Sequence, residues 1–172
     1  MLDYQRLKLM IAPFLIFAVG NESRGDDALG PLLLRELESW LIANEFAGQF
    51  ELLEEFQLQV EHAMDMKDRE LVIFIDASIN TRIPFCFYRA QTNDTPVLYS
   101  HALAPEALLK VYTQFYQQEP PAIFILGVCG ESFELGEGLS AQALERLSAA
   151  LEFSKKLLHQ PTAADWDNLC TH

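Results

Sequence analysis

Three short runs of the chain are apolar almost throughout, and longer segments with apolar residues at helical spacing lie between and after them. The runs are residues 14–19 (FLIFAV), 71–76 (LVIFID) and 122–128 (AIFILGV). Because none of them alternates with polar residues, each predicts a strand that is buried on both faces. Residues 50–56 and 84–90 predict two further strands. Pro84 favours a position near the sheet edge for the second of these, because proline cannot donate a ladder hydrogen bond.

The remaining segments have the pattern of amphipathic helices. Leucines recur on one face of residues 28–46, and a proline followed by a glutamate opens a helix predicted over residues 105–116. Residues 58–67 predict a short helix. A long helix is predicted over residues 139–158, with one apolar face made of Leu144, Leu147, Leu151 and Leu158.

This alternation of buried strands and amphipathic helices predicts an α/β sandwich with a mostly parallel sheet. The length of 172 residues predicts a single domain over residues 1–172, in which residues 159–172 form a loosely held tail. In open α/β sheets the ligand crevice lies at the carboxyl ends of the strands. The polar residues that follow the predicted strands are therefore the first candidates for a site: residues 21–27, Asp76 and residues 129–131.

Charge and cysteine content narrow the classes of partner and compartment. The formal net charge is -13, with 12 Lys and Arg against 25 Asp and Glu, which argues against a nucleic-acid-binding protein. Three widely spaced cysteines without a CxxC pair indicate reduced thiols in a cytoplasmic protein. The apolar run that ends at Val19 is too short to span a bilayer, and we interpret it as a strand rather than a signal peptide.

The stretch GNESRGDDAL at residues 20–29 places two adjacent aspartates where a buried strand meets a helix. Capping of the helix N-terminus explains one of Asp26 and Asp27, and metal ligation is the alternative. Asp76 ends an apolar run, where an unpaired carboxylate is costly and needs a partner or a cation. His101 precedes the helix predicted over residues 105–116. Two carboxylates and one histidine suit a divalent first-row metal with open coordination positions.

With these motifs, the chain resembles the hydrogenase maturation endopeptidases over residues 14–158. The resemblance is carried by four stretches: GNESRGDDALG, VIFIDA, SHALAPEALL and LGVCGESFELGEGLS. EEFQLQVEHAM is similar to a segment of the members that serve soluble NAD-reducing or bidirectional hydrogenases, with Val60 in place of a proline. These enzymes cut a C-terminal extension from the large subunit of a [NiFe] hydrogenase after nickel insertion.

The resemblance implies a three-layer α/β/α sandwich around a twisted five-stranded sheet. It assigns the metal-binding and catalytic positions to Asp27, Asp76 and His101, while Asp26 caps the helix or holds the loop. The implied metal is nickel supplied by the substrate, with no organic cofactor. The implied partner is the large-subunit precursor, in the cytoplasm, with no nucleic acid and no membrane involved.

Two rival functions remain open at this stage. The first is another metal-dependent amidase or hydrolase on the same fold, and the second is a non-catalytic nickel-sensing chaperone for the precursor. The sequence leaves open the cleavage site, the hydrogenase that is served, the oligomeric state and whether the metal activates water or only positions the bond. It also leaves open the roles of Gln57, Glu61 and Cys129.

Overall fold

The computed structural model describes residues 11–79, 81–91 and 103–171, and these form a five-stranded sheet in the order β2-β1-β3-β5-β4. The strands are β1 (Phe14–Val19), β2 (Phe50–Glu55), β3 (Leu71–Ser78), β4 (Phe85–Arg89) and β5 (Ala122–Cys129). β2, β1, β3 and β5 are parallel, and β4 pairs antiparallel with β5 at the edge. The five predicted strands and the edge position of the one that contains Pro84 are confirmed.

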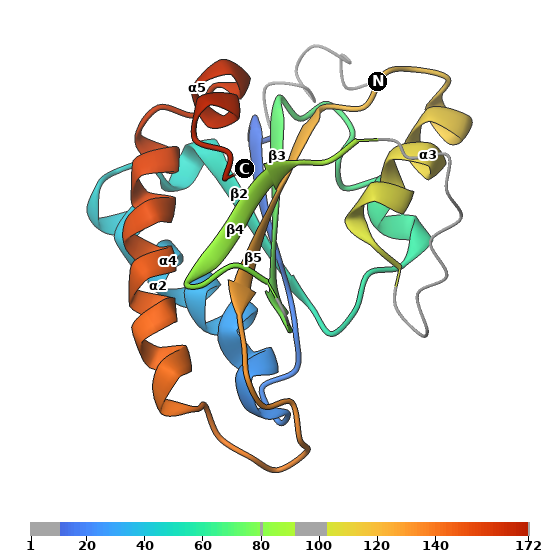
Figure 1. Cartoon of the computed structure of the whole chain (residues 1–172). Coiled ribbons are helices and arrows are strands. Elements are labelled where there is room, and N and C mark those ends of the chain that lie inside the picture. Colours follow the sequence, from blue (N-terminus) through green and yellow to red (C-terminus); the bar gives the residue numbers. More distant parts are fainter. Residues whose placement is uncertain (1–10, 80, 92–102, 172) are drawn as a thin grey trace.

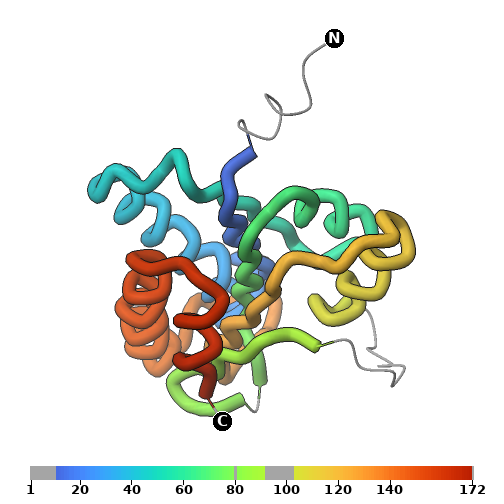
Figure 2. Tube along the Cα trace, turned by 90° about the horizontal axis from the view of Figure 1, so that it is seen from above, coloured from blue at the N-terminus to red at the C-terminus, as the bar shows by residue number. Residues whose placement is uncertain are grey.

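Helices cover both faces of the sheet, so the predicted α/β/α sandwich is confirmed (Figure 1). α2 (Leu29–Ala43), α4 (Ala141–His159) and α5 (Ala163–Asn168) lie on one face, and α3 (Pro105–Tyr116) lies on the other. Figure 2 shows the same separation in the view from above. Residues 58–67 form only a 3-10 turn, η3 (Val60–Ala63), which contacts α3. In the described part of the chain, no helix is both long enough and apolar enough to cross a membrane.

Each face of the sheet has its own apolar core, which explains the absence of polar alternation in the strands. In β1, Ile16 and Ala18 pack toward α2 and α4, whereas Leu15 and Phe17 pack in the core below α3. All four side chains are at most 1% exposed. The buried residues of a central strand such as β1 therefore need apolar side chains on both faces.

The predicted apolar face of the long helix is partly wrong. Leu144 is 57% exposed, and Leu147 and Leu151 are only partly buried. α4 instead buries a stripe that contains Ala143, Ala150 and Leu157. Leu158 of the predicted face is buried, as expected. The small side chains of Ala143 and Ala150 allow close contact between α4 and α2, so packing distance also contributes to which face is buried.

The expected loose tail over residues 159–172 is also wrong. Trp166 of α5 is 1% exposed, its indole nitrogen donates to the Leu157 carbonyl at 2.9 Å, and its ring lies 5.2 Å from that of Phe124. Thr171 N–H donates to the Phe87 carbonyl at 2.8 Å, which uses a hydrogen-bonding group of edge strand β4. The last residues therefore complete the core and cover a strand edge.

We predict that Trp166→Ala destabilises the protein by about 3 to 5 kcal/mol, because it removes a large buried side chain and its indole hydrogen bond. The matched control is Leu169→Ala on the same segment, where the side chain is 40% exposed and the expected change is within about 1 kcal/mol. Urea unfolding followed by circular dichroism measures both. Equal, small effects of the two substitutions would contradict the packing of α5.

Candidate active site

Asp76 lies within β3 near its carboxyl end. It pairs with Gly127 of β5 and is followed by two more strand residues, so it does not end the strand as the sequence indicated. Alternation along β3 places its side chain on the same face as Phe74, the face that α3 covers. The carboxylate is therefore held by a central strand rather than by a mobile loop.

Asp27 is positioned by a tight turn that follows β1. Gly20 and Gly25 have φ of 153° and 54°, and a Cβ on Gly20 would lie 2.1 Å from the Asp27 carbonyl oxygen. These two glycines allow the loop to fold back over the strand ends, as predicted. The Asp27 carboxylate accepts a hydrogen bond from Asn21 N–H at 2.9 Å. Its side chain is thus oriented by the backbone of its own loop.

The electrostatics of Asp27 and Asp76 show that the two carboxylates interact. Desolvation and the neighbouring negative charge of Asp27 raise the pKa of Asp76 to about 7. Desolvation also raises the pKa of Asp27, although Asn21 N–H and the charge of Arg24 act in the opposite direction. Both raised pKa values mean that burial of the charged forms is costly without a counter-ion.

Asp26, the preceding residue, has a different environment. It is fully buried, and its carboxylate accepts hydrogen bonds from the N–H groups of Glu131 (2.7 Å), Ser132 (3.3 Å) and Ser140 (2.8 Å) and from the Ser140 hydroxyl (2.8 Å). Desolvation favours the neutral form, but these donors outweigh it and hold the pKa of Asp26 below its usual range. Asp26 therefore joins the loop after β1 to the loop after β5.

The interpretation that an aspartate caps the following helix is wrong for both residues. The N-cap of α2 is Ala28, and α2 has no side-chain cap hydrogen bond. The alternative role of Asp26, holding the loop, is confirmed. The helix that Asp26 supports is α4, whose N-cap Ser140 donates its hydroxyl to Asp26 and accepts from Ala143 N–H at 3.1 Å.

Further bonds fasten the loop of residues 130–140 to the loop after β1. Asp26 N–H donates to Ser132 at 2.8 Å, and Gly25 N–H donates to Glu137 at 3.0 Å, both at the carbonyl oxygen. Gly136 N–H returns a bond to the Ser23 carbonyl at 2.7 Å. Since β3 lies between β1 and β5, the joined loops cross the end of the strand that carries Asp76.

Arg146 is a supporting residue that the sequence analysis missed. It is 7% exposed, and its guanidinium donates to the Cys129 carbonyl at 3.0 Å and to the Glu131 carboxylate at 2.6 Å. The same guanidinium lies 3.4 Å from the Cys129 sulfur. The sequence feature that could have revealed this role is the position of Arg146 among small residues on the buried face of α4, where a cation requires buried acceptors. These contacts give Cys129 and Glu131 structural roles at the start of the loop.

His101 lies outside the described residues, so its place relative to the two aspartates stays a prediction. The description of the chain resumes at Leu103, and this residue lines a cavity of about 240 Å³ together with Asp76. Within the described ranges, no group of three or more His, Cys, Asp or Glu side chains is arranged to hold a metal ion. In the predicted set, Asp27 and Asp76 would supply two oxygen ligands, and the imidazole of His101 would supply the third ligand.

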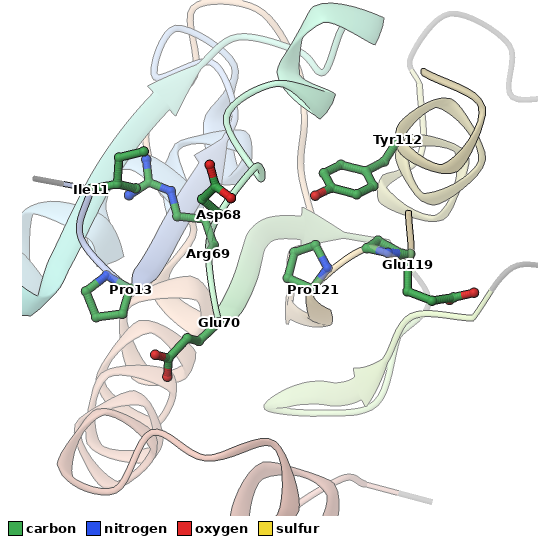
Figure 3. Close-up of a pocket in the computed structure, with 9 residues that line it drawn as sticks. Ile11, Pro13, Asp68, Arg69, Glu70, Tyr112, Glu119 and Pro121 are labelled. Atoms are coloured by element: carbon green, nitrogen blue, oxygen red, sulfur yellow. The ribbon is translucent and has the colours of Figure 1, made fainter. Parts of the chain in front are cut away.

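A second cavity, of about 340 Å³, lies at the amino ends of the strands (Figure 3). Pro13, Glu70 and Pro121 line it, and they precede β1, β3 and β5 respectively. Since Asp27 and Asp76 lie at the carboxyl ends of these strands, this cavity is not part of the candidate site.

We predict opposite effects on stability from one matched pair of substitutions at adjacent positions. Asp26→Asn should destabilise the protein by about 2 to 4 kcal/mol, because either orientation of the amide turns its NH₂ toward at least one buried backbone N–H. Asp27→Asn should leave stability unchanged or raise it, because it relieves repulsion with Asp76. Urea unfolding at pH 8 measures both. A destabilising Asp27→Asn together with a neutral Asp26→Asn would contradict the two assignments.

We also predict that Asp27→Asn lowers the pKa of Asp76, which stays above its usual value because desolvation is the larger cause. Carbon-13 NMR titration of the Asp76 carboxyl carbon measures this change, with Glu36→Gln on an exposed part of α2 as the control. The raised pKa of Asp76 also makes the free energy of unfolding depend on pH, because the folded state holds the Asp76 proton to a higher pH than the unfolded chain does. Its contribution to stability is fully present below about pH 4 and is lost as the pH rises through about 7 in the metal-free protein. An Asp76 pKa that is identical in wild type and Asp27→Asn would show that the carboxylates do not interact.

Comparisons with known proteins support the fold. No family model and no curated protein matches the sequence. Among solved structures, the hydrogenase maturating endopeptidase HybD from E. coli superposes with a TM-score of 0.64 and 24% identity, over 86% of this chain and 93% of that one. The [NiFe] hydrogenase maturation protease HycI from Thermococcus kodakarensis gives a TM-score of 0.63 at 22% identity, over 90% and 99%.

HybD from Thermococcus kodakarensis, also a [NiFe] hydrogenase maturation protease, gives a TM-score of 0.59 at 21% identity, over 84% of this chain and 98% of that one. All three matches span nearly the whole neighbour, so the likeness covers the complete sandwich and not a shared substructure. The resemblance inferred from the motifs is thereby confirmed for the fold: the chain has the fold of the hydrogenase maturation proteases.

Proposed function

We propose that this protein is an endopeptidase that removes a C-terminal extension from the nickel-loaded large subunit of a [NiFe] hydrogenase. The observation that carries the proposal is the pair of interacting carboxylates, Asp27 and Asp76, at the carboxyl ends of the central strands. The motif resemblance and the structural neighbours, which are themselves maturation proteases, support the same reaction and the same partner. The reaction takes place in the cytoplasm.

The two carboxylates fit a divalent cation that arrives with the substrate. Each is partly desolvated, and each has a raised pKa, so a cation between them removes an unfavourable repulsion. His101 is the proposed third ligand, and one residue separates it from Leu103, which lines the same cavity as Asp76. Nickel in the precursor supplies the positive charge that these three side chains bind.

The protein's own residues orient the site. Asn21 N–H fixes the Asp27 carboxylate at 2.9 Å, and Asp26 fixes the loop that carries both residues. Asp76 has little freedom, because its backbone is paired on β5 and its neighbours are core residues. A precursor whose nickel reaches both carboxylates is therefore held with one defined stretch of chain beside the crevice, which favours cleavage at a single bond.

We predict that wild-type protein shortens nickel-loaded precursor and leaves nickel-free precursor intact. Asp27→Asn, Asp76→Asn and His101→Ala should each reduce processing by at least about 100-fold, because each removes a group that positions the substrate's metal. His159→Ala is the matched histidine control, since its ring contacts Trp40 and Phe46 away from the sheet's carboxyl edge, and it should process normally. Mass spectrometry of the large subunit measures the shortening.

Three other outcomes would contradict the proposal, and two of them identify its rivals. Equal cleavage of nickel-loaded and nickel-free precursor would contradict the role of the substrate's nickel. Turnover of small amides without precursor cleavage indicates a general hydrolase. Stable, nickel-dependent binding of the precursor without any size change indicates a chaperone.

A further inference from the structure

A cavity of about 240 Å³ opens beside Asp76 on the face of the sheet that α3 covers. Two rows of paired strand residues form its floor. Asp76, Gly127 and Cys86 make one row across β3, β5 and β4, and Phe74, Ile125 and Tyr88 make the next. Paired residues in adjacent strands point to the same face, so all six positions face the cavity.

Gly127 creates part of the space in the first row. Gly127 has no side chain, and it separates Asp76 from Cys86 in the row of paired residues. A Cβ on Gly127 would lie 2.9 Å from the Cys86 sulfur, so even a methyl group at this position competes with that side chain for volume. Gly127 and Cys86 thus compete for the same volume on the floor of the cavity, and the proposed catalytic set includes neither residue.

The size of the cavity indicates what it can hold. Pockets for whole small molecules typically have about 300 to 1,000 Å³, so this one is better matched to a single side chain. Leu58 and Leu103 close it from the α3 side, and the described part of the chain places no Lys, Arg or His in its lining. Its walls are mainly apolar, which favours an apolar occupant.

Asp76 and Glu106, the two carboxylates in the lining, do not change the conclusion that the cavity favours an apolar occupant. Asp76 is engaged by the substrate's cation in the proposed reaction, and Glu106 accepts a hydrogen bond from the Tyr88 hydroxyl at 3.2 Å. Together they disfavour an acidic side chain in the cavity, because like charges repel at short range. The remaining surface, made of Val19, Phe74 and Ile125 among others, is what an occupant contacts.

We propose that this cavity is a specificity pocket that accepts one apolar side chain of the precursor next to the cleaved bond, with Gly127 and Cys86 setting its depth. The inference rests on the proposed endopeptidase function and extends it, since Asp76 both lines the pocket and belongs to the proposed catalytic set. Gly127 and Cys86 are specificity-determining residues in this scheme, and neither takes part in bond cleavage.

The test uses nickel-loaded precursors in which each residue flanking the cleavage site is changed in turn to Leu, Ala, Asp or Lys. For wild-type protein, kcat/KM at the pocket position should favour Leu over Ala by roughly tenfold, as expected for a few methylenes in an apolar pocket. Gly127→Ala should remove most of this preference by impairing the Leu precursor and sparing the Ala precursor. The double variant Cys86→Ala with Gly127→Ala should restore the preference, because loss of the sulfur makes room for the new methyl group.

Unimpaired cleavage of the Ala precursor by Gly127→Ala separates a pocket effect from misfolding, because misfolding would impair cleavage of both precursors. Cys170→Ala is the matched cysteine control, since its sulfur contacts the Trp166 carbonyl at 3.6 Å outside the pocket, and it should keep the wild-type preference. As an independent measurement, iodoacetamide treatment of the Cys170→Ala protein should slow cleavage of the Leu precursor. The same treatment should have no effect when Cys86→Ala is also present.

The outcomes distinguish this inference from the function on which it rests. Failure of wild-type protein to cleave any precursor contradicts the proposed function itself. Normal cleavage with an unchanged Leu-to-Ala ratio in Gly127→Ala, at every flanking position, contradicts the pocket alone. Preference for Lys over Leu at the position that responds to Gly127→Ala would show a cation-binding pocket instead and would overturn the apolar assignment.

Discussion

The buried carboxylate of Asp26 is the interaction on which the carboxyl end of the sheet depends. β1 and β5 are separated by β3, so the loops that follow them meet only by crossing the end of that strand. A fully buried charge requires hydrogen-bond donors, and Asp26 finds them in the loop after β5 and at the first turn of α4. One side chain thereby fixes both loops and the start of a helix, because moving any of them would deprive the buried charge of some of its donors.

This arrangement separates the two adjacent aspartates into different tasks. The donors around Asp26 stabilise its charged form and lower its pKa, whereas Asp27 accepts one backbone hydrogen bond and has a raised pKa. Asp26 stabilises the fold, whereas Asp27 interacts with Asp76 without a positive charge in the described residues that fully compensates the two carboxylates. Because Asp26 and Asp27 are adjacent in the sequence, the hydrogen bonds that hold Asp26 in place also restrict the backbone of Asp27.

The sequence was sufficient for the sheet and for part of the site. Runs such as FLIFAV admit one interpretation when both faces of the strand are covered. Asp76 became a candidate because it follows such a run, whereas the choice of Asp27 over Asp26 came from the family resemblance, and the role of both as metal ligands stays a prediction. The role of Asp26 was harder to assign, because its partner Ser140 is 114 residues away and no local pattern reports such a contact. For the same reason, helical spacing alone misplaced Leu144 and could not show that Trp166 anchors the last residues.

The interaction of Asp27 with Asp76 has a cost that the rest of the structure offsets. Two partly buried carboxylates that raise each other's energy would separate if the loop after β1 were free to move, and the repulsion would then be lost. The bonds of Asp26 and the turn at Gly20 prevent this movement, so the repulsion is retained in the folded protein. In the proposed reaction, binding of the substrate's cation would relieve that repulsion without first ordering the loop after β1. A rigid anchor next to an unfavourable pair of charges would thus favour binding of a metal that the substrate brings.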